Sequence, residues 1–280
     1  MTEAEKPQAL DLRPEAILAR ATAARGDIFP EWKTVVYASP KTYHLINQTV
    51  SYLHQYHGQP AQREGSGQLS VPMRELIAIP ALCSKGDLRH APNHIRRMYR
   101  EGLTNKALFE AAAAFASVVG WASLTYVSLA IEQANSADYP FGKLPPGGEP
   151  KELKPFAEML VGRTRQAGSR DSLADTQEWR YAADIDAELA RRAAAFVDHC
   201  VAADDEDETI LGPGPRELIV IAALCTRGEV EMAAHHMRRA YACGMTRRQV
   251  LDAICCVVPM SGMVSATLGL RAMRLVDGEK

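Results

Sequence analysis

The chain carries one segment twice, and this internal repeat constrains the fold more than any other feature of the sequence. VPMRELIAIPALCSKGDLRHAPNHIRRMYREGLT at 71–104 aligns with PGPRELIVIAALCTRGEVEMAAHHMRRAYACGMT at 213–246. Glu75 and Glu217 lie 142 positions apart, and the same offset continues without a gap beyond the end of both segments. A constant offset over this length indicates a duplicated structural unit.

The repeat also predicts how the chain is divided. Upstream, Trp32 corresponds to Trp179 at an offset of 147, so the first copy holds a few extra residues before its main match. A Pro- and Gly-rich stretch, YPFGKLPPGGEPKE at 139–152, is typical of a linker. We predict a first repeat at 1–138, a linker at 139–152 and a second repeat at 153–280. The two repeats are expected to pack as a pseudo-dimer within one chain.

Each copy has the pattern of short consecutive helices. Pro72 suits the first turn of a helix through RELIAIPALC, and Gly86 suits the turn that ends it. The next helix ends near Gly102, and in the second copy Thr246 and Gln249 have the spacing of a capping box at the start of a third helix. Alternating β-branched runs bounded by turns are missing from the sequence. We therefore predict an all-α protein without a substantial sheet.

The composition argues against several classes of partner. The chain is 47% hydrophobic and 24% charged, as in an ordinary globular protein, and its net charge of −2 creates no field that attracts nucleic acid or acidic lipid. The apolar stretch 111–131 is long enough to span a bilayer. Its counterpart in the second copy contains Pro259, so we interpret the stretch as a helix buried in an all-helical core. We expect neither a nucleic acid nor a membrane as a partner.

Cysteine usage favours a reducing compartment. Six cysteines in a chain of 280 residues, with no Cys-x-x-Cys among them, do not suggest a disulfide scaffold. The N-terminal sequence MTEAEKPQALDLRPEA is polar and lacks the apolar segment of a secretion signal. We expect a cytoplasmic protein. Cys83 and Cys225 correspond between the copies, and we interpret them as buried packing residues rather than nucleophiles.

A Glu and a His recur at one spacing in both copies. His94 lies nineteen positions after Glu75, and His236 lies nineteen positions after Glu217. A carboxylate on one helix can fix the tautomer of an imidazole on the next and raise its basicity, which is the arrangement of a general acid/base pair. The alternative is a buried pair that only ties two helices together. Because the pair occurs twice, each time after an Arg, we favour catalysis.

The Arg-Glu-Leu helix, the His helix that ends in Gly and the following helix together resemble the carboxymuconolactone decarboxylase superfamily. The resemblance covers about residues 31–134 and 178–275. It implies a compact AhpD-like helical bundle that assembles as a trimer or hexamer, with sites between helices near subunit contacts. For a chain with two copies, it implies a homo-oligomer of three tandem chains.

The superfamily has a redox branch and a decarboxylase branch. AhpD-type peroxidase partners carry a Glu, then a Cys-x-x-Cys pair, then the His. This chain keeps the Glu and His at that spacing, but Asp87 and His90 stand at the two Cys positions of the first copy. Glu229 and Met232 stand there in the second copy. Disulfide exchange needs thiolates, so the resemblance favours the decarboxylase branch.

The expected substrate is a small carboxylic acid or lactone of the aromatic ring-cleavage type. Loss of CO₂ from such an acid leaves an enolate-like charge, and a protonated His94 held by Glu75 would deliver a proton to carbon. Arg74 or His90 would hold a carboxylate or the developing oxyanion. Asp87 is spaced so that it would share one helical face with His90 and His94. As an alternative, these three side chains could bind a metal ion.

No metal or cofactor is nevertheless expected, because Pro92 interrupts that face and the second copy has Met232 in place of His90. The same replacement leads us to expect the principal site in the first copy. Two other functions fit the sequence. A redox protein would show peroxide turnover that depends on Cys83 or Cys225. A non-catalytic ligand-binding or assembly protein would tolerate replacement of Glu75.

Overall fold

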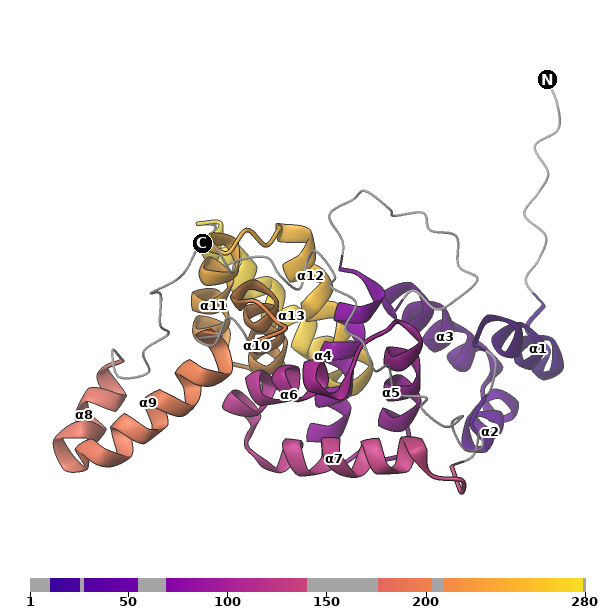
Figure 1. The fold of residues 1–280 in the computed structure, drawn as a ribbon. Helices are drawn as coiled ribbons and strands as arrows, with labels where there is room; N and C mark the ends of the chain where they lie inside the picture. The colour runs from indigo at the N-terminus through magenta and orange to yellow at the C-terminus, as the bar shows by residue number, and fades with distance from the viewer. Residues whose placement is uncertain (1–10, 26–27, 55–68, 140–175, 203–208, 279–280) are drawn as a thin grey trace. The chain divides into compact units, whose positions relative to one another are not determined.

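The computed structural model describes residues 11–25, 28–54, 69–139, 176–202 and 209–278, and every regular element in these ranges is a helix. The prediction of an all-α fold is confirmed for this part of the chain. The chain forms two compact units, residues 1–62 and residues 63–280. Figure 1 labels the helices along the chain.

The first unit contains three helices, and prolines open all of them. They are α1 (Pro14–Arg25), α2 (Pro30–Ala38) and α3 (Pro40–His54). Proline suits a first helical position because its missing N–H would have no partner there. Ile17 and Ala21 of α1 pack with Val36 of α2 and Tyr43 of α3 in a small apolar core.

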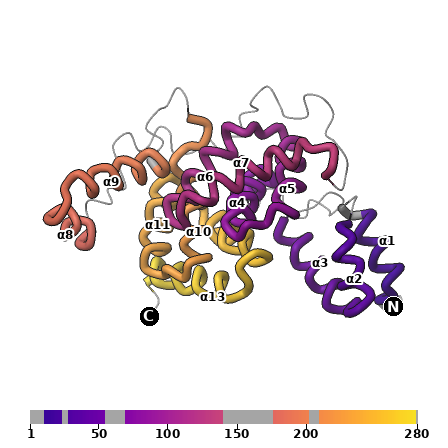
Figure 2. Tube along the Cα trace, turned by 90° about the horizontal axis from the view of Figure 1, so that it is seen from below, coloured from indigo at the N-terminus to yellow at the C-terminus, as the bar shows by residue number. Residues whose placement is uncertain are grey.

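The second unit contains the remaining helices and the larger core. They are α4 (Val71–Ser84), α5 (Ala91–Arg100), α6 (Asn105–Val119), α7 (Ala122–Asn135), α8 (Gln177–Ile185), α9 (Ala187–Ala202), α10 (Pro213–Arg227), α11 (Val230–Ala242), α12 (Arg247–Cys256) and α13 (Val258–Val276). Helix α4 packs against α5, α6 and α7, and α10 packs against α11, α12 and α13. Helices α6 and α10 lie side by side and join the two groups (Figure 2).

Glycine and proline residues in the turns determine where α5 and α11 begin. Gly86 and Gly228 follow α4 and α10 with φ of 72° and 84°, a left-handed conformation that glycine adopts without strain. Pro92 lies in the first turn of α5, so that helix begins at Ala91. The second copy has an alanine at the matching position, and α11 begins earlier. A proline inside a helix would clash with the preceding turn, which explains the difference.

The apolar stretch 111–131 is not the single buried helix that we predicted. It is divided between α6 and α7, because Gly120 takes φ of 101° and ends α6. Several α6 side chains in the stretch are buried, whereas Tyr126 and Leu129 of α7 are exposed. Among the described residues, no helix is both long and apolar enough to cross a membrane.

The predicted repeat boundaries stay a prediction. Almost all of the proposed linker lies outside the described residues, and the two compact units divide the chain elsewhere, after residue 62. Helix bounds agree with the repeat over its main match: α4 begins at Val71 and α10 at Pro213, 142 positions later. Helices α5 and α11 end at Arg100 and Ala242, again 142 positions apart.

Candidate active site

The first Glu–His pair joins α4 to α5. Glu75 lies on α4 with none of its side chain exposed, and His94 lies on α5. The imidazole Nδ1 is 2.6 Å from the carboxylate Oε2. An ionised carboxylate only accepts hydrogen bonds, so Nδ1 is the donor in that state and any proton exchanged with a substrate passes through Nε2.

The second pair has the same geometry between α10 and α11. Nδ1 of His236 is 2.7 Å from Oε2 of Glu217, and the carboxylate is again fully buried. The prediction that each Glu contacts its His is therefore confirmed in both copies. The contact alone does not distinguish a catalytic pair from one that ties two helices together.

An arginine on the same helix as each His completes the group, and it was not among the residues predicted from the sequence. The guanidinium Nη1 of Arg97 is 3.2 Å from Oε1 of Glu75. In the second copy Nε of Arg239 donates to Oε1 of Glu217 at 2.7 Å. Each arginine follows its histidine by three residues, so both side chains lie on one helical face. This spacing in both copies was the available signal.

The two histidines differ in exposure. His94 exposes 15% of its side chain, whereas His236 exposes 6%. Arg97 exposes 5% of its side chain and Arg239 exposes 13%. The first pair thus presents its imidazole to the surface more openly, and the second pair is the more enclosed.

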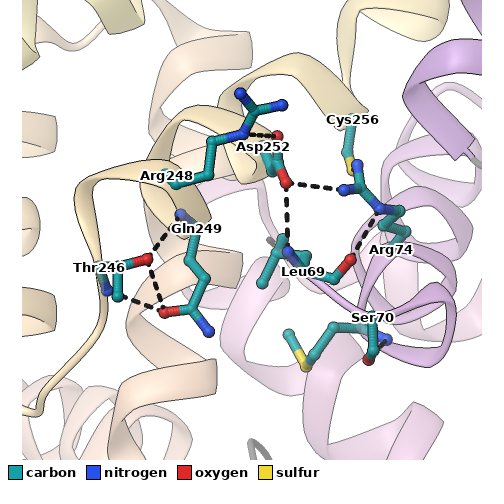
Figure 3. A network of polar contacts seen from close by, with 9 residues as sticks. Leu69, Ser70, Arg74, Thr246, Arg248, Gln249, Asp252 and Cys256 are labelled. Atoms are coloured by element: carbon teal, nitrogen blue, oxygen red, sulfur yellow. Dashed lines mark hydrogen bonds and ion pairs between the residues drawn. The ribbon is translucent and has the colours of Figure 1, made fainter. Parts of the chain in front are cut away.

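Arg74 does not lie with the pair that its neighbour Glu75 forms. Its guanidinium, on a side chain only 1% exposed, donates through Nη2 to Oδ2 of Asp252 at 2.7 Å and through Nε to the carbonyl of Leu69 at 3.1 Å. Figure 3 shows this network, in which Arg248 donates to the other oxygen of Asp252. This placement argues against the substrate-binding role that we gave Arg74, because its charge is neutralised by a buried carboxylate.

Arg216 forms the equivalent contact, from the second copy to the first. Its Nη2 donates to Oε2 of Glu110 at 3.0 Å, and its Nε donates to the carbonyl of Leu211. Arg216 and Glu110 are the equivalents of Arg74 and Asp252 at the repeat offset of 142. Each copy therefore sends its arginine to an acid on the third helix of the other copy.

His90 lies at the start of α5 and is bonded to Asp87, not to Glu75. Its Nδ1 is 2.8 Å from Oδ2 of Asp87, and both side chains are about one-third exposed. Burial acts to raise the pKa of Asp87, but hydrogen bonds from the His90 ring and from nearby backbone N–H groups outweigh it and lower that pKa. Asp87 itself lies in the turn before α5, so Asp87, His90 and His94 do not share a helical face as the metal alternative required.

The described cysteines are all free, and burial makes them poor nucleophiles. The pKa values of Cys83, Cys225 and Cys256 are raised from 9.0 to about 12, chiefly because burial penalises the charged thiolate. The same cause raises the pKa values of Cys200 and Cys243 to about 11. At neutral pH these groups remain thiols, and a thiol is neither a good nucleophile nor a good metal ligand.

Comparison with known proteins identifies the helical region around the second pair. A search among curated proteins finds no match. The family model described as the carboxymuconolactone decarboxylase family matches residues 187–275, which include Glu217, His236 and Arg239. This match supports membership in the carboxymuconolactone decarboxylase/AhpD-like superfamily for that part of the chain.

Proposed function

We propose that the chain is a non-redox enzyme of this family that decarboxylates a small carboxylic acid or lactone of the aromatic ring-cleavage type. The observation that carries the proposal is the contact between Glu75 and His94: a fully buried carboxylate 2.6 Å from a partly exposed imidazole. A carboxylate that only tied two helices together would not need a titratable partner at the surface. General acid/base catalysis does need one.

The proposed reaction breaks the bond between a ring carbon and the carboxylate. The electron pair of that bond moves into a conjugated carbonyl, and CO₂ leaves. The imidazolium of His94 then donates the proton on Nε2 to carbon, while Nδ1–H keeps its hydrogen bond to Glu75. The pair of electrons on the enolate forms the new C–H bond, and His94 recovers its proton from water. Glu75 stabilises the imidazolium before transfer and holds the ring in place.

His90 is the remaining sequence candidate for binding the substrate carboxylate. It is partly exposed, it lies one helical turn before His94, and its ring is oriented by Asp87. A protonated His90 supplies a hydrogen-bond donor and a positive charge. Arg74 is instead assigned to the structural contact with Asp252.

A thiol redox function finds little support. The two Cys positions of the redox branch hold Asp87 and His90 in the first copy and Glu229 and Met232 in the second. The cysteines that do occur have pKa values raised by burial, which keeps them protonated. Buried thiols without disulfide partners agree with the proposed cytoplasmic location.

We further propose that the two copies form a pseudo-dimer through the reciprocal arginine contacts. Arg74 reaches Asp252, and Arg216 reaches Glu110. Helices α6 and α10, which carry Glu110 and Arg216, pack against each other. In this proposal one chain takes the place of two single-copy subunits, and three chains complete a closed oligomer.

The direct test is a screen of aromatic ring-cleavage acids and lactones for CO₂ release by the purified full-length chain. The proposal expects at least one compound to lose CO₂ in a reaction that Glu75→Gln slows strongly. A compound that binds without turnover, with Glu75→Gln binding as wild type does, would favour the ligand-binding alternative instead.

A further inference from the structure

The guanidinium of Arg97 and the imidazole of His94 contact different oxygens of one buried carboxylate, that of Glu75. Oε1 of Glu75 faces Nη1 of Arg97 at 3.2 Å, and Oε2 faces Nδ1 of His94 at 2.6 Å. The carboxylate is fully buried, and 5% of the arginine side chain is exposed. The charge of Glu75 is therefore balanced inside the protein rather than by solvent.

In the second copy, an arginine and a histidine likewise contact different oxygens of one carboxylate. Oε1 of Glu217 accepts from Nε of Arg239 at 2.7 Å, and Oε2 faces Nδ1 of His236 at 2.7 Å. The two arginines use different guanidinium nitrogens but contact the same oxygen. Recurrence of the contact despite this difference indicates that the position of the positive charge matters more than one particular hydrogen bond.

We propose that Arg97 is a positioning residue that keeps Glu75 ionised, so that the proton shared by Glu75 and His94 resides on the imidazole. This inference rests on the proposed function, in which the imidazolium of His94 donates its Nε2 proton to carbon. The neighbouring Arg74 is instead paired with Asp252.

The location of the shared proton decides what the pair can do. With Glu75 ionised, the proton resides on the ring, and the imidazolium is an acid strong enough to donate from Nε2. A buried carboxylate that loses its cation either carries an unbalanced charge or takes up a proton. The neutral acid would donate to Nδ1 and leave a neutral ring with its proton on Nε2. A neutral imidazole is a far weaker acid than an imidazolium, so proton delivery to carbon would fail.

The experiment follows the ring nitrogens of His94 by NMR in the full-length chain labelled with ¹⁵N-histidine. In the wild type, Nδ1 of His94 is expected to carry a proton throughout the pH range in which the protein is folded. In Arg97→Met, Nδ1 is expected to lose its proton and Nε2 to carry one near neutral pH. A folded Arg97→Met protein in which Nδ1 of His94 stays protonated would overturn the proposal and leave Arg97 a packing residue.

The duplication supplies a matched control. Arg239→Met is expected to change the ring nitrogens of His236 and to leave those of His94 as in the wild type. Arg97→Lys retains a positive charge and is expected to retain Nδ1–H on His94. A folded Arg97→Lys protein with the pattern expected of Arg97→Met contradicts the proposal. If Arg97→Met does not fold, Arg97→Gln replaces it, because glutamine removes the charge but keeps a hydrogen-bond donor. Loss of the Nδ1 proton of His94 in Arg97→Gln would support the proposal, and its retention would overturn it.

A second control removes Arg96, a neighbouring buried arginine whose hydrogen bond and ring contact lie on other residues. Arg96 donates through Nε to the carbonyl of Ala134 and lies over the ring of Tyr139. Arg96→Met is expected to leave the His94 ring nitrogens unchanged, and a change equal to that in Arg97→Met would count against the proposal.

The NMR readout needs no substrate, so it fails or succeeds separately from the proposed reaction. A screen without CO₂ release would leave the proton position measurable, and an unchanged His94 ring in Arg97→Met would leave the decarboxylation screen standing. Once a substrate is found, Arg97→Lys should retain more of kcat than Arg97→Met, with KM little affected in both.

Discussion

Individual residues in the two copies have equivalent partners but different access to solvent. His94 and His236 each contact a buried glutamate at nearly equal distance, whereas the exposed fraction of the first imidazole is more than twice that of the second. Glu75 and Glu217 are equally buried. The distinction between the copies therefore arises at the histidine and its surroundings. In the proposed function the acid must reach its substrate, and the greater exposure of His94 favours the first copy.

The cysteines lead to a prediction about redox chemistry. Because burial raises the pKa of Cys83 to about 12, its thiolate is a negligible fraction at neutral pH. We expect the purified chain to consume no peroxide with a thioredoxin-like reductant, measured by peroxide loss over time. Cys83→Ser should give the same background rate. Substantial consumption that disappears in Cys83→Ser would restore the redox function.

The same burial predicts how stability changes at alkaline pH. The pKa of Cys256 is raised from 9.0 to about 12 in the folded state, so its contribution to stability is fully present below about pH 9 and is lost as pH rises towards 12. Each such thiol should steepen the fall in unfolding free energy by about 1.4 kcal/mol per pH unit. Urea unfolding between pH 9 and pH 11 should therefore show a shallower slope for Cys256→Ala than for wild type. Parallel curves for the two proteins would contradict this.

Helices α4 and α10 each supply residues to two different contacts. Along α4, Glu75 contacts α5 and the preceding Arg74 contacts Asp252 of α12. On an α-helix, neighbouring residues point about 100° apart, so one helix can contact the candidate site on one side and α12 on the other. The adjacent Arg and Glu of the Arg-Glu-Leu sequence therefore contact two different helices.

Removal of one partner of the Arg74–Asp252 contact should be costly. The pair is almost fully buried, so Arg74→Met leaves a carboxylate without its main cation and should lower the unfolding free energy by about 3–5 kcal/mol. The double variant Arg74→Met/Asp252→Leu should recover much of that loss. Arg191→Ala, which breaks an exposed contact with Glu188, should lower the unfolding free energy far less, because solvent screens that pair. Urea unfolding measures all three, and additive losses in the double variant would contradict the coupling.

Sequence patterns predicted the local elements better than the contacts between distant ones. The spacing of Glu75 and His94 placed them on adjacent helices, and their contact is confirmed. Asp252 lies 178 residues from Arg74, so no local pattern could indicate that they meet. The break at Gly120 was missed because the alanine-rich run on its N-terminal side favours continuous helix, and a positive φ leaves no mark in hydrophobic periodicity.

For the whole molecule, the proposed pseudo-dimer leads to a prediction of assembly. If one chain replaces two single-copy subunits, three chains of 30.6 kDa each should form the stable species in solution. Light scattering coupled to size-exclusion chromatography should give a mass three times that of the chain at micromolar concentration. A monodisperse monomer over the same concentrations would contradict the proposed assembly, without bearing on the Glu–His chemistry.

The central claim is that Glu75 and His94 perform acid/base chemistry in the first copy, and matched kinetics on His94→Ala and His236→Ala test it most directly. With a substrate from the CO₂-release screen, His94→Ala should lose at least about a hundredfold in kcat, or about 2.7 kcal/mol in the barrier. His236→Ala should stay within severalfold of wild type, with thermal melts confirming that both variants are folded. Equal losses would mean two working sites, a loss confined to His236→Ala would place the site in the second copy, and full activity in both variants would contradict the account.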